Sequence, residues 1–317
     1  MPELPEVQTI VDDLNKKIKG DAITDFWSDA PSAIKNATAA EFKKAIVGKK
    51  IIEAHRIGKN MFIDLSGGKT MYIHLKMTGH LLVKNFKFQI SNFKSKSNDK
   101  ISNDQDYFND RVNQYIHHKW FLNSDIKNSK LNQNSKLKIQ NFNKTLEFSD
   151  MRKFAKIVLL DTKDLRNYKD IVKLGVDAIS REFTFEKFSA ILDKRQKAPI
   201  GIVLMDQDLI VGIGNIYRSE ILFEAGVLPD RKVADLTGNE RKNIYVNIGK
   251  TLKKAIKLRG TSDSDYRDTS GAPGKFHEVL KVYRREKKPC KICGTIIKRM
   301  RSGGRSAFFC EKCQDSF

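Results

Sequence analysis

All four cysteines of the chain lie within its last 28 residues, which leaves few possible folds for the C-terminal end. They form two C-x2-C pairs separated by sixteen residues: Cys290, Cys293, Cys310 and Cys313. Two such pairs supply the four thiolates of a closed tetrahedral zinc site. A disulfide framework is the alternative, but it is typical of secreted chains with cysteines spread along their length. We therefore predict one structural zinc, with Gly303-Gly304 turning a hairpin between the pairs.

The charge of the chain indicates a polyanionic partner. Lys and Arg total 59 against 38 Asp and Glu, a net charge of +21. Nucleic acid is the commonest partner of so basic a protein, although a generally basic composition that serves only solubility would look the same. Neither a run of ~18 apolar residues nor a secretory signal is present. We expect a soluble, cytoplasmic monomer with no membrane contact.

Hydrophobic periodicity divides the first half into one helix and many strands. Helical spacing runs from Glu3 to about Ile18 and is followed by Gly20. A short helix is predicted at 39–47, and strands are predicted at 22–27, 50–57, 61–65, 69–75, 81–83, 115–122, 145–148 and 157–160. A helix followed by many strands predicts a β-sandwich that carries the helix on its rim.

Three domains are expected, in an α+β fold. The N-terminal sandwich spans 1–174 and includes two Asn- and Lys-rich stretches without Gly or Pro, 85–114 and 123–143, which are predicted to be solvated, partly disordered insertions. Residues 182–282 are predicted to be helical, with helices near 185–192, 215–225 and 236–258. The zinc hairpin occupies 283–317.

The residues after Met1 combine an unusual amine with two carboxylates. Pro2 is small enough that Met1 is ordinarily removed, which would make Pro2 the N-terminal residue. α-Amino groups titrate near ~8, so part of this amine is nucleophilic at neutral pH. An iminium on proline has no N–H to lose and acts as an electron sink. Glu3 and Glu6 lie within one turn and suit acid–base work, although the same residues also suit an ordinary first helical turn.

Two further features suit phosphate. The segment Gly212-Ile213-Gly214-Asn215-Ile216-Tyr217 is a glycine turn leading into a helix, with Asn215 as the expected cap. Its free N–H groups could bind a phosphate, and a tight turn between helices is an equal alternative. Arg305 follows the predicted hairpin turn in a module with ten basic and three acidic residues. It could reach a phosphate or a groove, or belong to a solvated charged hairpin.

Taken together, five motifs in this order resemble one family. They are Pro2 to Val7 (PELPEV), His74 to His80 (HLKMTGH), Asp150 to Phe154 (DMRKF), Gly212 to Tyr217 (GIGNIY) and the four-cysteine finger. The chain resembles the formamidopyrimidine-DNA glycosylases over nearly its whole length, apart from the Asn- and Lys-rich stretches. Leu4 resembles this branch more than the endonuclease VIII branch, which usually has Gly at that place. The resemblance implies a helix-two-turns-helix domain at 182–282 and damaged double-stranded DNA as partner.

The resemblance also assigns catalytic roles. Pro2 would attack the sugar C1′ while Glu3 assists as acid and base, and Glu6 would orient this machinery. Lys59 matches the lysine that holds a phosphate beside the reaction centre. The implied activity removes oxidised purines (8-oxoguanine and formamidopyrimidines) through a Schiff base and then cleaves the abasic site by β- and δ-elimination.

The remaining implied roles concern DNA contacts. A flipped base leaves a gap in the duplex, and Met77, Arg152 and Phe154 match the residues that fill it. Further phosphate contacts are implied for His74, Asn215 and Arg305. Without the resemblance, the sequence would predict that Met77 and Phe154 are core residues. Two alternatives stay open: an endonuclease VIII-like enzyme for oxidised pyrimidines, and a noncatalytic zinc-ribbon DNA-binding protein.

Overall fold

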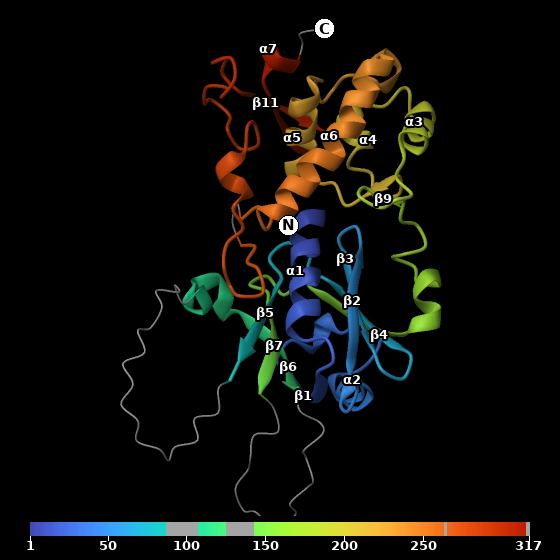
Figure 1. Cartoon of the computed structure of the whole chain (residues 1–317), viewed down its shortest axis with the longest axis vertical. Coiled ribbons are helices and arrows are strands. Elements are labelled where there is room, and N and C mark those ends of the chain that lie inside the picture. The colour runs from blue at the N-terminus through green and yellow to red at the C-terminus, as the bar shows by residue number, and fades with distance from the viewer. Residues whose placement is uncertain (87–106, 125–142, 263–264, 315–317) are drawn as a thin grey trace, which may run out of the picture.

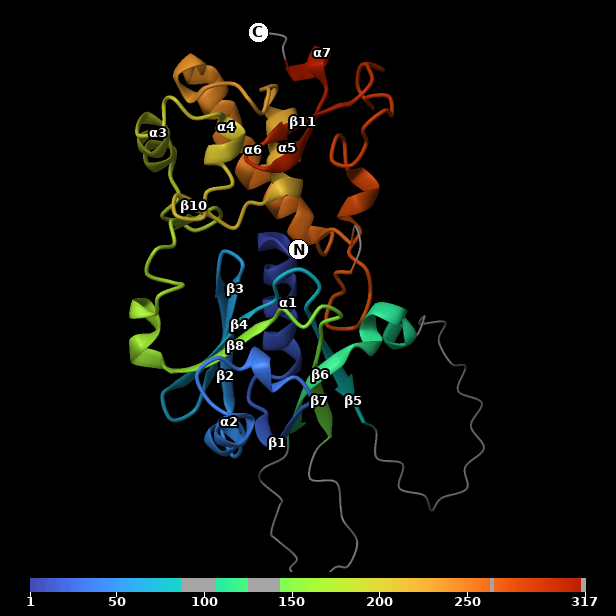
Figure 2. The ribbon, with the colours of Figure 1, turned by 180° about the vertical axis from the view of Figure 1, so that it is seen from behind.

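The computed structural model describes residues 1–86, 107–124, 143–262 and 265–314. The sandwich occupies one end of the molecule and the helical half with the zinc hairpin occupies the other, and helix α1 begins where they meet and runs into the sandwich (Figures 1 and 2). What the sequence predicts for 87–106 and 125–142 lies outside the described residues. In the described parts of the chain no helix is both long and apolar enough to cross a bilayer.

Two four-stranded antiparallel sheets form the sandwich, as predicted. In spatial order the first contains β1 (Ala22–Ser28), β6 (Ile116–Asn123), β7 (Lys144–Ser149) and β5 (His80–Asn85). The second contains β2 (Ile51–Ile57), β3 (Asn60–Leu65), β4 (Lys69–His74) and β8 (Lys156–Asp161). Apolar side chains of both sheets share one buried core with α1 and with α2 (Ala39–Ile46). Gly67-Gly68, with positive φ at both residues, turns β3 into β4.

Helix α1 (Leu4–Lys17) belongs to both halves of the molecule. Val7, Ile10 and Leu14 lie in the sandwich core at helical spacing. Leu4, at the first turn, instead lies in the apolar core of the helical half, and α1 also contacts helix α6. The first turn of α1 is therefore held where the two halves meet.

The second half is helical and ends in the predicted hairpin. Its elements are β9 (Val176–Asp177), α3 (Phe185–Asp193), α4 (Ile200–Val203), β10 (Ile210–Val211), α5 (Asn215–Ala225), α6 (Gly238–Lys257), β11 (Lys298–Ser302), β12 (Arg305–Phe309) and α7 (Glu311–Gln314). Helices α5 and α6 pack together, and Gly303-Gly304 turns β11 into β12. Both halves of the molecule also contain short 3-10 helices, which are η1 (Pro31–Ala33), η2 (Tyr107–Asn109), η3 (Arg111–Gln114), η5 (Thr162–Asn167), η6 (Val233–Asp235) and η7 (Phe276–Val279). The α+β prediction is confirmed.

The prediction for 85–114 is wrong at its C-terminal end. Residues 107–114 form η2 and η3 rather than a solvated extension, and Asn113 is 1% exposed. The Ser149 hydroxyl donates to the Val112 carbonyl at 2.8 Å, and Arg267 pairs with Asp110. Asp110 and Asn113 are polar because their side chains bond to other parts of the fold, which composition alone does not reveal.

Candidate active site

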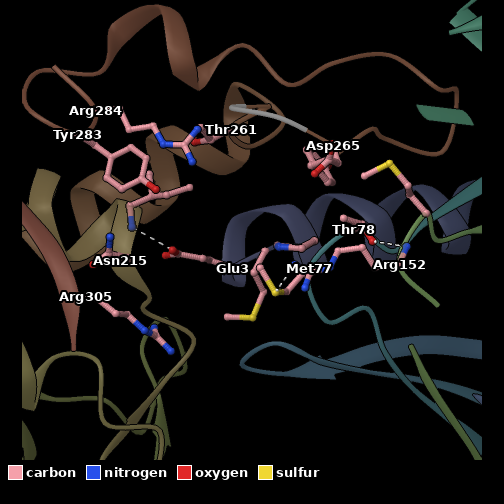
Figure 3. A pocket seen from close by; sticks show the side chains of 15 residues that line it. Glu3, Met77, Thr78, Arg152, Asn215, Thr261, Asp265, Tyr283, Arg284 and Arg305 are labelled. Carbon is pink, nitrogen blue, oxygen red and sulfur yellow. Dashed lines mark hydrogen bonds between the residues drawn. The ribbon is translucent and has the colours of Figure 1, made fainter. Parts of the chain in front are cut away.

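A pocket of about 490 Å³ lies where the two halves meet. The sandwich side contributes the chain start, Met77 and Arg152, and the helical side contributes Asn215 and Arg305. Figure 3 shows Arg305, Asn215 and Tyr283 facing Met77 and Arg152, with Glu3 between the two groups. Pro2 also lines this pocket, so six of the ten residues predicted for catalysis and DNA contact come together here.

The Glu3 side chain crosses to the helical half. Its carboxylate accepts hydrogen bonds from the backbone N–H groups of Gly214, Ile216 and Tyr217, at 2.7, 3.0 and 3.4 Å. These groups begin α5, where the helix dipole favours negative charge. Glu3 is only 3% exposed, so the start of α5 both orients the carboxylate and stabilises its charge.

The contact between Glu3 and the start of α5 differs from the phosphate site that the glycine turn suggested. The N–H groups expected to bind a phosphate bind Glu3 instead, and a Cβ on Gly214 would lie 2.4 Å from the Glu3 carboxylate. Glycine is therefore required for the close approach of a side chain. The prediction that Asn215 caps the helix is wrong, because Gly214 is the N-cap residue and Asn215 is the first residue of α5.

Asn215 and Arg305 are held at the pocket by the zinc hairpin. The Asn215 side chain donates to the Ser306 carbonyl at 2.9 Å and accepts from Arg218 at 2.5 Å. Arg218 is fully buried and also donates to the Ser306 carbonyl at 3.2 Å. This network joins α5 to β12 beside Arg305, which lines the pocket and gives this side of it a positive charge.

Glu6 lies beneath the pocket. Its carboxylate accepts from the Glu3 N–H at 2.7 Å, the Tyr217 hydroxyl at 2.5 Å and the Thr261 N–H at 2.7 Å. Burial, followed by the negative charge of Glu3, raises the pKa of Glu6 from 4.5 to about 7. Glu6 can thus hold or release a proton near neutral pH while it joins α1, α5 and the segment after α6.

The raised pKa of Glu6 predicts a pH-dependent stability. Between pH 4.5 and 7 the folded protein binds a proton that the unfolded chain releases, so this carboxyl lowers the free energy of unfolding as the pH rises, by up to about 1.4 kcal/mol per pH unit. Glu6→Gln cannot ionise, so its unfolding free energy should rise relative to wild type across this interval. Urea unfolding at a series of pH values measures this. Parallel profiles for the two proteins would contradict the assignment.

Lys59 and His74 lie near the pocket but do not line it. Lys59, in the turn between β2 and β3, is 6% exposed and donates to the Ile213 carbonyl at 2.9 Å. Burial lowers its pKa, against the opposing charge of Glu3. Burial, then the positive charge of Lys76, lowers the pKa of His74 to about 4. Its Nδ1 accepts from the Lys76 N–H at 3.0 Å, so the neutral ring carries its proton on Nε2 and can donate it.

Met77, Arg152 and Phe154 form an exposed cluster on the sandwich side. Met77 and Phe154 are 46% and 52% exposed, so neither is a core residue. The Arg152 guanidinium donates to the Met77 sulfur at 3.0 Å and lies 4.5 Å from the centre of the Phe154 ring. Buried Asp150 holds this loop by accepting from the N–H groups of Arg152 and Ala155, at 3.3 and 2.8 Å. The cluster thus presents two apolar side chains and a cation to solvent.

The three parts of the chain match three family models in order. Residues 1–157 match the formamidopyrimidine-DNA glycosylase N-terminal domain, 174–267 its H2TH domain, and 287–315 the zinc finger found in FPG and IleRS. The formamidopyrimidine-DNA glycosylase of Pelotomaculum thermopropionicum is 34% identical over 99% of both chains, and that of Carboxydothermus hydrogenoformans is 35% identical over 99% of this chain and all of its own. The chain belongs to the formamidopyrimidine-DNA glycosylase family.

Solved structures of the same family have the same fold. A complex of Lactococcus lactis Fpg with DNA that contains an abasic site has a TM-score of 0.77 at 26% identity, covering 98% of this chain and 99% of that one. Thermus thermophilus MutM (FPG) has a TM-score of 0.76 at 28% identity, covering 99% of both chains.

The four cysteines fit the zinc of this glycosylase family. Their sulfur atoms lie within 4.8 Å of one another, with 3.9 Å between Cys290 and Cys313 and 3.4 Å between Cys293 and Cys310. A tetrahedral site with Zn–S bonds of about 2.3 Å places its sulfurs about 3.8 Å apart. The chain holds one structural zinc, which fixes the hairpin that carries Arg305. Gln314 joins this module to the end of α5, because its side chain donates to the Val227 carbonyl at 2.7 Å.

Loss of a cysteine should affect DNA binding and spare the sandwich. Cys310→Ser is expected to release the metal and weaken duplex binding at least about tenfold, because folding of the hairpin depends on zinc and the hairpin carries basic side chains. The sandwich should stay folded, since its core contains no residue of the hairpin. Metal content, duplex titration at fixed salt and circular dichroism measure the three effects. Zinc-free wild-type protein with full duplex affinity would contradict this.

Several residues of the site were not predicted from the sequence. Tyr217 bonds Glu6, and Gln207 supports the glycine turn by accepting from the Gly212 N–H at 3.0 Å and donating to the Ile213 carbonyl at 2.9 Å. Tyr266, Tyr283 and Arg284 line the pocket. Tyr217 stands within the GIGNIY motif, which could have indicated it. The other four lie outside the quoted motifs and reach the site only through folding.

Proposed function

We propose that this protein removes oxidised purines, 8-oxoguanine and formamidopyrimidines, from duplex DNA and cleaves the resulting abasic site. The observation that carries the proposal is the position of Pro2 and Glu3 in the pocket between the two halves, opposite basic and apolar side chains. Family membership supplies the reaction class. We further propose that the protein acts as a cytoplasmic monomer.

Pro2 is the proposed nucleophile once Met1 has been removed. Its amine would attack C1′ of the damaged nucleotide as the bond from C1′ to the base breaks, and Glu3 would take the amine proton and pass it to the leaving base. The C1′–O4′ bond would then break, with a proton going to O4′, to give the iminium. The iminium would acidify the C2′ hydrogen, so that β-elimination and then δ-elimination excise the sugar. We propose that Glu6 orients Glu3 by bonding its backbone N–H, and that Lys59 provides positive charge for a phosphate beside the reaction centre.

The proposed DNA contacts lie on both sides of the pocket. Asn215 and Arg305 would bind backbone phosphates from the helical side, and His74 would donate from Nε2 on the sandwich side. Met77, Arg152 and Phe154 would fill the gap left by the flipped base. We assign chemistry and gap filling to 1–174, duplex binding to 182–282 and a further DNA contact to the zinc hairpin of 283–317.

A panel of duplexes tests this function. Wild-type protein should excise 8-oxoguanine faster than thymine glycol, and borohydride should trap it covalently on both 8-oxoguanine and abasic DNA. A preference for thymine glycol would identify an enzyme of the endonuclease VIII kind. Duplex binding without excision or trapping would support the other alternative, a noncatalytic DNA-binding protein.

Truncation of Met77 should separate base flipping from chemistry. Met77→Ala should slow excision of 8-oxoguanine about tenfold or more, because the side chain stabilises only the unstacked duplex, whose opening costs a few kcal/mol. A preformed abasic site has already lost its base, so its cleavage should change much less. Single-turnover rates on the two substrates measure the difference.

The same experiment needs a stability control. Met77 is 46% exposed, so its truncation should leave the melting temperature nearly unchanged, as should Ile52→Ala at a 48% exposed position of β2. Equal losses of rate on both substrates, together with a lowered melting temperature, would show that Met77 is a structural residue.

A further inference from the structure

The 107–114 turn contacts the segment that follows α6. This turn, made of η2 and η3, precedes β6 of the sandwich, whereas residues 265–275 follow α6 of the helical half in the chain and pack Tyr266 into the sandwich core. Both views show the turn beside the long loop that descends from α6 (Figures 1 and 2). Asp265 and Tyr266 of that loop line the candidate active-site pocket. A part of the chain that composition assigns to solvent therefore lies behind one wall of the pocket.

An ion pair joins the turn to the loop directly behind this wall. Arg267 donates from Nε and Nη2 to one carboxylate oxygen of Asp110, at 2.9 and 2.8 Å. Its Nη1 donates to the Tyr266 carbonyl at 2.8 Å. The two side chains are 13% and 30% exposed, so the pair is partly shielded from water. One guanidinium thus connects the turn to the backbone of a residue that lines the pocket.

A buried amide makes the second contact. The Asn113 side chain donates to the Gly271 carbonyl at 3.1 Å and to the Tyr107 carbonyl at 2.7 Å, and its oxygen bonds His80 Nε2 at 2.8 Å. Gly271 has a φ of +79°, and a Cβ there would lie 2.7 Å from the Asn113 amide nitrogen. The loop and the turn therefore fit each other closely in shape as well as in hydrogen bonding.

Other contacts hold the far side of the loop to α1. Asp13 accepts from the Thr269 hydroxyl at 2.8 Å and from Arg259 at 2.5 Å, and Lys17 donates to the hydroxyls of Thr269 and Ser270 at 2.7 Å. These bonds do not involve the turn. Loss of the Asp110 contact should therefore shift the loop without releasing it.

We propose that Asp110, with Asn113, is a positioning residue that holds the Asp265–Tyr266 wall of the pocket in place for the damaged nucleotide. The substrate in this inference rests on the proposed function. Tyr266 is itself held to α1, since its hydroxyl donates to the Glu6 backbone carbonyl at 3.4 Å, so loss of the turn contact would misplace the wall around the damaged base more than the reacting groups. An error of about 1 Å in such positioning can slow a reaction about 100-fold.

Asp110→Ala tests the proposal through two independent measurements on the full chain. Amide hydrogen exchange over residues 266–272 should accelerate at least about tenfold, because the loop loses one of its anchors. Excision of 8-oxoguanine should slow about tenfold, while strand cleavage at a preformed abasic site changes less than about threefold. Asp110→Glu, which keeps the carboxylate, should restore both quantities in part.

Three further variants make the result specific. Asp193→Ala removes a similar partner of an arginine, since Arg241 donates to it at 2.7 Å, but it lies in α3 away from the pocket; it should change neither quantity. Arg267→Ala should reproduce Asp110→Ala, and the double variant should lose little more than either single one, because the two side chains act as a pair.

Unchanged exchange over 266–272 in Asp110→Ala, or additive losses in the double variant, would overturn the positioning role. So would equal slowing on lesion and abasic duplexes. If wild-type protein excises no 8-oxoguanine, the proposed function fails, and the exchange experiment still decides whether the turn holds the loop.

Discussion

Pro2→Gly is expected to lower both base excision and strand cleavage at least about 100-fold, because both reactions would pass through the same covalent intermediate. Glycine keeps an amine at the chain start, but its Schiff base can lose a proton and become neutral, whereas the proline iminium cannot. Glycine also loses the rigid ring that fixes the amine in the buried start of the chain. Single-turnover rates on 8-oxoguanine and abasic duplexes measure the effect.

The structure supplies both a rival nucleophile and a control for this prediction. Lys59 is buried, and its pKa is lowered, so it is the interior amine best prepared to compete. Peptide mapping of the borohydride adduct should place it on residue 2, and an adduct on Lys59 would refute the assignment. Pro5→Gly makes the same exchange in the first turn of α1. It should reduce stability while it leaves the rates of folded enzyme within a few-fold of wild type.

Glu3→Gln is expected to slow base excision about 1000-fold, because it removes the acid–base group and keeps the shape of the side chain. Cleavage of a preformed abasic site should fall less, since no base remains to be protonated. The substitution also removes negative charge from the start of α5, where the three N–H groups converge. That loss should cost about 1 kcal/mol of stability.

A purely structural Glu3 would give a different result. If it only caps α5, the folded variant should excise 8-oxoguanine and cleave abasic DNA at nearly wild-type rates, with stability alone reduced. Measuring rates well below the melting temperature of the variant separates the two roles. Glu224→Gln is the control for loss of a carboxylate outside the pocket, because Glu224 lies in α5 and forms a salt bridge with Lys281.

Patterns that act over a few residues were readable from the sequence. The four-cysteine spacing predicts the metal centre because each pair supplies two ligands locally, and the sulfurs converge as expected. The period of Val7, Ile10 and Leu14 predicts α1, because burial on one side of a helix recurs every three or four residues. The family resemblance added the candidate site, because its motifs mark residues that helical period, strand pattern and ligand spacing do not single out.

Contacts between distant residues were decided only by folding. The start of α5 has the composition of a phosphate site, yet it binds Glu3 from 211 residues away. Met77 and Phe154 are apolar and locally indistinguishable from core residues, and their exposure depends on how the loops that carry them sit on the sandwich. Asn113 is polar within a polar stretch and is nevertheless buried, because His80 and Gly271 satisfy its amide. Burial and hydrogen-bond partners belong to the assembled molecule, whereas helical period and ligand spacing belong to the chain.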